Sequence, residues 1–124
     1  MSINPAFRSK FEERVWGLIP DGLRKKVIYE PKDGKLPYVL NLNYLPDFIL
    51  PNGIHVETKG KLTTEDRRKM IAVKAANPNI EIRFVFQRAK NALRKGAKTT
   101  YAEWAERYGF KWAEGHIPEE WFKE

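Results

Sequence analysis

The chain has 124 residues, a length that supports one domain with its own hydrophobic core but not two independent ones. It has no cysteine, which excludes a disulfide framework and a thiolate metal site, and no run of about 18 apolar residues that could span a bilayer. Its 23 lysines and arginines against 16 acids give a net charge of +7, which favours a polyanionic partner such as nucleic acid. We expect one domain over residues 1–124, acting in the cytoplasm.

The N-terminal third contains apolar residues at helical spacing, which predict an amphipathic helix over about residues 5–19. Residues 27–29 are a candidate for a short strand, and the alternation in YVLNLNYL, residues 38–45, predicts another. The stretch PDFILPNGIHVETKG, residues 46–60, predicts a β-hairpin around an Asn-Gly turn.

The C-terminal half alternates helices and strands with clear start signals. In chain order we predict a Thr-capped helix over 63–77, a central strand over 80–87, a helix over 100–109 with a capping box from Thr100 to Glu103 and Gly109 at its end, a short strand over 110–113 and a helical turn over 117–121. This order predicts an α/β fold, with helices packed on a mixed sheet.

The length of the hairpin loop decides where its two carboxylates point, because side chains alternate along a strand. With a two-residue loop, Asp47 opposes Thr58, and Glu57 projects from the other face. With a three-residue loop, Asp47 opposes Glu57 directly. Only the second register places the apolar residues together on one face and the charged residues on the other; these sets are Phe48, Leu50, Ile54 and Val56, and Asp47, Glu57 and Lys59. Hydrophobic patterning therefore favours the register in which the carboxylates meet.

Two carboxylates held across a strand pair repel each other and favour a bound cation. Oxygen ligands without cysteine or clustered histidine suit a hard ion, so we expect Mg²⁺, with Mn²⁺ able to replace it. Lys59, two residues after Glu57, could orient or deprotonate an attacking water and meet a phosphate oxygen. The alternative is a solvated, salt-bridged face, which so short a pattern leaves open.

Five blocks of sequence, in one order over most of the chain, extend this pattern. They are AFRSKFEERV at 6–15, PDFILPNGIHVETKG at 46–60, DRRK at 66–69, IRFVF at 82–86 and IPEEW at 117–121. The second block resembles the PD…(D/E)xK nuclease superfamily, and the whole set is similar to the phage endonuclease I family of Holliday junction resolvases. The resemblance implies a restriction-endonuclease-like nuclease core that hydrolyses phosphodiester bonds with metal ions and resolves four-way and other branched DNA by paired nicks.

The resemblance also implies roles for individual residues. Asp47 and Glu57 match the metal-binding carboxylates and Lys59 the catalytic lysine. Glu12 matches an additional acid from the first helix, with Glu13 as the adjacent competitor, and the backbone carbonyl of Thr58 is a weaker candidate ligand. The number of ions, one or two per site, stays open.

Family members are intertwined homodimers, so the resemblance implies that residues of about 5–36 are exchanged between subunits and that about 37–46 form the crossing segment. By composition alone this segment is equally an ordinary strand. The resemblance implies a phage- or prophage-encoded protein that acts in a bacterial host. Six cations could contact DNA phosphates: Arg8, Lys10, Lys61, Arg67, Arg68 and Lys69. Two other functions fit the sequence, a different nuclease of the superfamily and a non-catalytic DNA-binding module.

Overall fold

The structure is a computed structural model that describes residues 5–124. Its contacts divide the chain into two compact units, Met1–Asn41 and Leu42–Glu124, which are described separately. The boundary falls within the predicted crossing segment. No helix of the described residues is long and apolar enough to cross a membrane.

The first unit contains two helices, α1 (Lys10–Leu18) and α2 (Asp21–Arg24). The predicted helix begins later than expected because Ser9 is its N-cap, with its hydroxyl accepting from the backbone N–H of Glu12. The short helix α2 follows where a turn was expected. Phe7 packs against the rings of Trp16 and Tyr29, at centroid distances of 5.8 and 5.0 Å, and joins α1 to the chain that follows α2.

Two predicted strands are absent from the structure. Residues 27–29 and 38–45 lie in no strand, and Leu40 and Leu42 are exposed. A strand needs a neighbour to pair its backbone groups, and neither segment has one among the described residues. Alternation of apolar residues indicated an extended chain but not the partner that would make it a strand.

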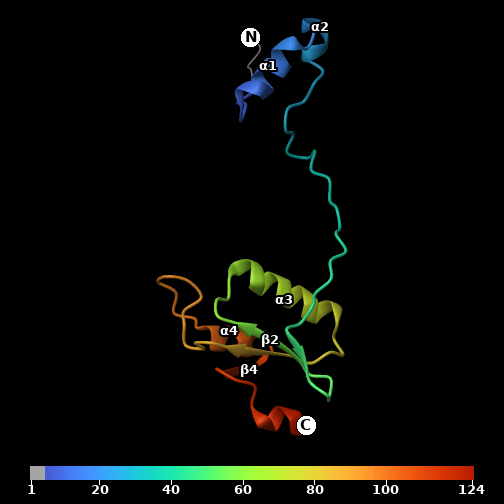
Figure 1. Cartoon of the computed structure of the whole chain (residues 1–124). Coiled ribbons are helices and arrows are strands. Elements are labelled where there is room, and N and C mark those ends of the chain that lie inside the picture. The colour runs from blue at the N-terminus through green and yellow to red at the C-terminus, as the bar shows by residue number, and fades with distance from the viewer. Residues whose placement is uncertain (1–4) are drawn as a thin grey trace. The chain divides into compact units, whose positions relative to one another are not determined.

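The second unit is built on a four-stranded mixed sheet with the order β1-β2-β3-β4 (Figure 1). Its strands are β1 (Phe48–Ile49), β2 (His55–Lys59), β3 (Ile82–Phe86) and β4 (Lys111–Glu114). The pair β1 and β2 is the antiparallel hairpin, whereas β3 runs parallel to both β2 and β4. All five residues of β3 are buried, which confirms that this strand is central.

Three helices complete this unit, namely α3 (Thr64–Ala76), α4 (Tyr101–Arg107) and the 3-10 helix η1 (Glu119–Lys123). Thr63 and Asp66 form a capping box at the start of α3, and Thr100 and Glu103 form the predicted one at the start of α4. Gly109, with φ +81°, follows the C-cap of α4 in the left-handed conformation that favours glycine.

Both faces of the sheet are covered. On one face Phe84 and Phe86 pack with residues of α3 and α4, including Met70 and Trp104. On the other, Leu50, Ile54, Val56 and Val85 pack against Trp121 of η1, which lies on the side opposite α3 (Figure 1). Arg83 fixes η1 from within the sheet, because its two terminal nitrogens each lie 2.6 Å from a carboxylate oxygen of Glu124.

Candidate active site on the β1–β2 hairpin

The hairpin has the three-residue loop that hydrophobic patterning predicted. Phe48 pairs with Val56, and the backbone N–H of Leu50 donates to the carbonyl of Ile54 at 2.9 Å. Gly53 occupies the last loop position with φ +90°, a conformation that glycine adopts without strain. Continued by one pair, this register sets Asp47 opposite Glu57.

The hydrogen-bonding pattern makes this pair a close one. The N–H of Leu50 donates to the carbonyl of Ile54, and hydrogen-bonded pairs alternate with non-hydrogen-bonded pairs along an antiparallel ladder, so 48:56 is of the first kind. The next pair, 47:57, is then a non-hydrogen-bonded one, the type in which opposite side chains lie closest. The next hydrogen-bonded pair would be 46:58. Because Pro46 has no N–H, it cannot donate to the carbonyl of Thr58, and that carbonyl points toward the β1 side without a ladder partner.

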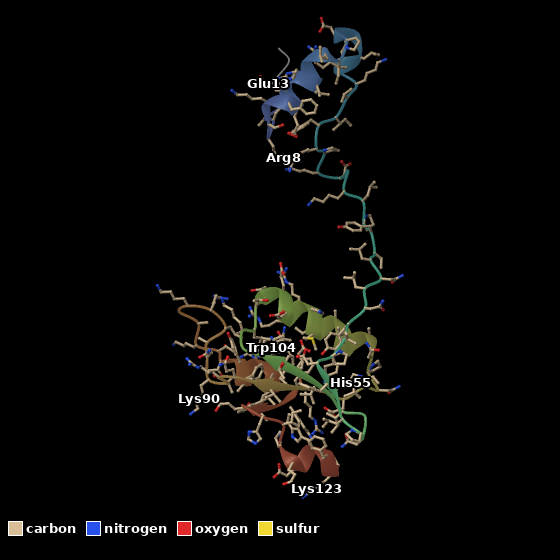
Figure 2. All side chains as sticks on the ribbon, viewed as in Figure 1. Arg8, Glu13, His55, Lys90, Trp104 and Lys123 are labelled. Carbon is tan, nitrogen blue, oxygen red and sulfur yellow. The ribbon has the colours of Figure 1, made fainter. Side chains whose placement is uncertain are left out.

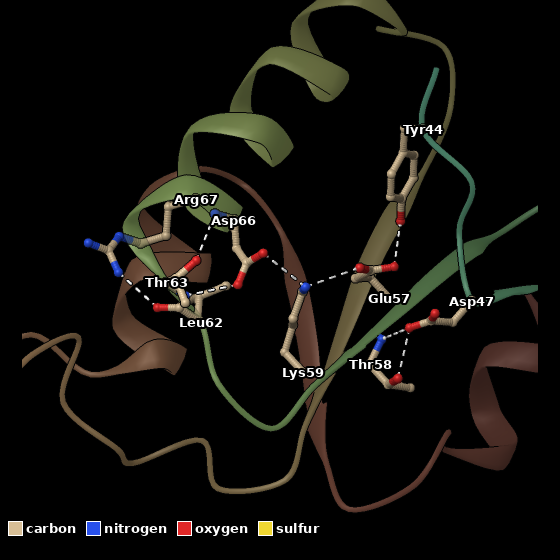
Figure 3. A network of polar contacts seen from close by, with 9 residues as sticks. All are labelled: Tyr44, Asp47, Glu57, Thr58, Lys59, Leu62, Thr63, Asp66 and Arg67. Atoms are coloured by element: carbon tan, nitrogen blue, oxygen red, sulfur yellow. Dashed lines mark hydrogen bonds and ion pairs between the residues drawn. The ribbon is translucent and has the colours of Figure 1, made fainter. Parts of the chain in front are cut away.

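The side chain of Asp47 takes the place of the carbonyl of residue 46, as the acceptor for the N–H of Thr58. Its Oδ2 accepts hydrogen bonds from both the backbone N–H and the hydroxyl of Thr58, each at 2.8 Å (Figure 3). The backbone N–H of Thr58 is the largest cause of a lowered pKa of Asp47, followed by the Thr58 hydroxyl, and the charge of Lys59 adds to it. Asp47 is therefore an anion at neutral pH.

Glu57 is buried, with 8% of its surface exposed, because it shares the sheet face of Phe84 beneath the helices. Its Oε1 accepts a hydrogen bond of 2.9 Å from the hydroxyl of Tyr44, and its Oε2 lies 3.5 Å from Nζ of Lys59 (Figure 3). Burial and the hydrogen bond to Glu57 raise the pKa of Tyr44, so the phenol keeps its proton and remains a donor. The sequence analysis missed Tyr44, whose only signal was its place three residues before Asp47.

Lys59 lies between two carboxylates. Its Nζ is 3.1 Å from Oδ1 of Asp66, closer than to Glu57, and Asp66 is itself fixed by the capping box of α3. Desolvation lowers the pKa of Lys59, but the hydrogen bond and charge of Asp66, assisted by Glu57, outweigh it, so the pKa is raised. Lys59 is thus an ammonium at neutral pH, suited to donating to a phosphate oxygen or a water rather than to removing a proton.

The oxygen atoms around Asp47 suit a hard divalent cation. The candidate ligands are the carboxylates of Asp47 and Glu57 and the unpaired carbonyl of Thr58, all oxygen donors of the kind that Mg²⁺ prefers. No hydrogen bond to Oδ1 of Asp47 is found within residues 5–124, which leaves that atom accessible. Over the same range no group of three or more acids or histidines lies together, so a third carboxylate would have to come from elsewhere.

Glu12, the predicted additional acid, belongs to the first unit, where its carboxylate is held in place. Its Oε1 accepts from the hydroxyl of Tyr29 at 2.7 Å and from the backbone N–H of Arg8 at 3.0 Å. The hydrogen bond from Tyr29 is the main cause of its lowered pKa. Glu13, the competing residue, is exposed, and none of the hydrogen bonds or ion pairs found in residues 5–124 involves its side chain.

The six predicted DNA-contacting cations have unlike surroundings. Arg8 forms an ion pair with Glu30, and Arg67 donates to the carbonyl of Leu62 at 2.9 Å. Nζ of Lys69 lies over the ring of Tyr44, 5.4 Å from its centroid. The remaining three, Lys10, Lys61 and Arg68, are exposed.

Comparison with known proteins gives consistent matches over almost the whole chain. A model of the family described as phage endonuclease I matches residues 2–124. The chain is 42% identical over 122 residues to Endonuclease I of Escherichia phage T7, covering 96% of this chain and 80% of that protein. It is 37% identical over 116 residues to Endodeoxyribonuclease 1 of Enterobacteria phage T3, covering 91% and 74%. The chain therefore belongs to the phage endonuclease I family.

Proposed function

We propose that this endonuclease is a metal-dependent enzyme that resolves four-way and other branched DNA junctions by paired nicks. Its family makes it a DNA-cleaving hydrolase. The observation that carries the finer proposal is the hairpin register, which sets Asp47 opposite Glu57 with Lys59 beside them. As the two relatives are phage proteins, we place its action in the cytoplasm of a bacterial host.

Each group at the hairpin has a role in phosphodiester hydrolysis. Asp47, Glu57 and the carbonyl of Thr58 would hold one or two Mg²⁺ ions, with Mn²⁺ as a substitute. When bound, the metal supplies positive charge that makes water more acidic and stabilises the leaving oxygen. Lys59 donates a hydrogen bond to a phosphate oxygen as negative charge develops there. A water oxygen forms the new bond to phosphorus and one ester P–O bond breaks. The water gives up a proton to solvent, and the leaving oxygen takes up a proton from solvent to become a hydroxyl.

The active site is completed in a homodimer whose chains exchange residues of about 5–36. In this arrangement Glu12 of one chain joins Asp47, Glu57 and Lys59 of the other. Glu12 would supply a third carboxylate to the site, where the described residues of a single chain bring no three acids or histidines together. Exposed apolar residues support it, since Leu36, Tyr38 and Val39 are each more than 80% exposed, as is typical of a surface that a partner covers. A twofold dimer brings two sites to the two symmetric strands of a junction, hence the paired nicks.

One cleavage experiment tests the activity. A labelled four-way junction and its separate linear arms are incubated with the chain in Mg²⁺, Ca²⁺ or chelator. We expect cutting of the junction in Mg²⁺ only, and Asp47→Asn should nearly abolish cutting while junction binding remains. Equal cutting of the linear arms would indicate a different nuclease of the superfamily, and binding without any cutting would indicate a non-catalytic module.

Subunit mixing tests the shared site. Glu12→Ala chains and Lys59→Ala chains, each inactive alone, should regain about one working site per heterodimer after exchange. Glu13→Ala is the matched control, because it removes the neighbouring acid and should leave cutting unchanged. No recovery after verified exchange would mean that each site is formed within one chain.

A further inference from the structure

The loop between β3 and α4 is the most strongly basic segment of the chain. Residues 87–98, the basic loop, contain five cations and no acid: Arg88, Lys90, Arg94, Lys95 and Lys98. Five positive charges within 12 residues are a large share of a net charge of +7. The loop therefore has a local positive potential that the scattered charges elsewhere do not match.

The base of the basic loop is fixed by backbone hydrogen bonds. The N–H of Leu93 donates to the carbonyl of Thr99 at 3.0 Å, and the N–H of Tyr101 donates to the carbonyl of Asn91 at 2.9 Å. Ala92 and Thr100 form a β-bridge, and Leu93 packs against the core. The cations are therefore presented on an ordered support, which lowers the entropy cost of ordering them on a ligand.

The basic loop starts beside the candidate active site. Lys59 is the last residue of β2 and pairs with Phe86, the last residue of β3. The next residue, Gln87, donates its backbone N–H to the carbonyl of Lys59 at 3.0 Å. Because β2 and β3 are parallel, the chain leaves both at the same edge of the sheet. Figure 1 shows the loop extending from this sheet beyond its strands.

The five cations are open to solvent and uncommitted. All five are exposed, and within residues 5–124 none forms an ion pair, a side-chain hydrogen bond or a cation–π contact. Lys90, labelled in Figure 2, extends away from the protein. In contrast, Lys59, Arg67 and Arg83 are engaged with acids or carbonyls. Nothing in the fold of the second unit uses the charge of the basic loop.

We propose that the basic loop is a DNA-backbone clamp that binds phosphates flanking the cleaved one. This inference rests on the proposed function, since it places the same DNA on Lys59 and on the loop. A loop of 12 residues runs about six residues away from the sheet and six back, so its tip lies at most roughly 20 Å from its base. This distance corresponds to about six base pairs of DNA, at 3.4 Å per step. The contacts lie on one duplex arm, within that distance of the cut, and read no sequence because phosphates are common to all nucleotides.

The salt dependence of binding tests the clamp. In an Asp47→Asn background, which keeps the DNA intact, the loop variant Arg94→Gln/Lys95→Gln/Lys98→Gln is compared with a control variant, Arg107→Gln/Lys111→Gln/Lys123→Gln. Both variants remove one arginine and two lysines, all exposed, so the net charge falls equally. Lys111 begins β4, at the end of the parallel strands opposite Lys59. Binding to a labelled four-way junction is measured from about 50 to 200 mM salt.

Three phosphate contacts contribute up to about 2.7 to the slope of log K against log[salt]. The salt slope of the loop variant should be smaller than that of the parent chain by this amount. The fourfold rise in salt should therefore weaken junction binding by the loop variant about 40-fold less than it weakens binding by the parent chain. The control variant should keep the parent slope. A loop variant with the slope of the control, while both melt at the parent temperature, overturns the clamp. The proposed function is judged separately, by whether the unmutated chain cuts the junction in Mg²⁺.

Discussion

The hydroxyl of Tyr44 gives a specific test of how the hairpin site is held. It donates to Oε1 of Glu57 at 2.9 Å, and the remaining contact of that carboxylate, to Lys59, is longer at 3.5 Å. In Tyr44→Phe the ring stays and only this donor is lost. Glu57 is then a buried carboxylate with one weak partner, and it no longer has a fixed position opposite Asp47.

The size of the effect follows from the kind of bond removed. A hydrogen bond to a charged group contributes about 1.5–3 kcal/mol, and the half-buried position of Tyr44 places this one at the lower end. We expect the free energy of unfolding to fall by about 1.5 kcal/mol. Because the carboxylate must return to its position before each reaction, junction cleavage should slow by about tenfold. The Mg²⁺ concentration for half-maximal cleavage should rise.

Urea denaturation and single-turnover cleavage measure the two effects. Tyr108→Phe is the matched control, because it removes a phenol hydroxyl that has no hydrogen bond among the described residues and keeps the ring contact with Trp104. Its stability and cleavage rate should equal those of the parent. If Tyr44→Phe also matches the parent in stability, rate and Mg²⁺ dependence, the hydroxyl does not position Glu57, and our account of the site is wrong.

Two further predictions concern Lys59 and η1. In Asp66→Asn the amide oxygen can still cap α3, but Lys59 loses its closest anion, which lies at 3.1 Å. Cleavage should slow by about tenfold, which is the effect of losing one charged hydrogen bond. An unchanged single-turnover rate would contradict this role of Asp66. The pKa of Glu124 is lowered in the folded chain, and the hydrogen bond from Arg83 is the largest cause. The ionised Glu124 therefore stabilises the fold above the ordinary glutamate pKa of about 4.3, and this stabilisation is lost as the pH falls through the lower pKa of the folded chain. The melting temperature of Glu124→Gln should therefore lie below that of the parent at pH 7, and this difference should shrink as the pH falls below the ordinary glutamate pKa. A difference that does not change with pH would show that the charge is not responsible.

The sequence was sufficient for the hairpin and for the elements that follow it. Alternation between apolar and charged residues selected the three-residue loop, because a shift by one residue would have reversed every side chain. Capping residues located α3 and α4, since Thr63 and Thr100 satisfy backbone N–H groups that no other part of a helix can. These features depend on contacts between residues close in the chain.

The sequence failed where the outcome depends on a distant partner. The alternating residues 38–45 have the pattern of a strand, but pattern does not supply the neighbour that a sheet requires. For the same reason Tyr44 was missed, since it reaches Glu57 across 13 positions of the chain. Asp66 had a usable signal: the link from Lys59 to the cap at Thr63 is only a few residues long, so the first turn of α3 had to lie near Lys59.

The pairing of proline with aspartate at positions 46 and 47 has a physical reason that the fold makes visible. A hydrogen-bonding residue at position 46 would close the ladder on the carbonyl of Thr58, and a longer β1 would carry its backbone past Glu57. Proline stops the ladder one step early, and the side chain of Asp47 satisfies the N–H of Thr58 instead. The carbonyl of Thr58 and the free oxygen of Asp47 are then left unpaired next to Glu57. The end of a strand thus becomes a set of oxygen donors, and the site follows from interrupting regular structure at one residue.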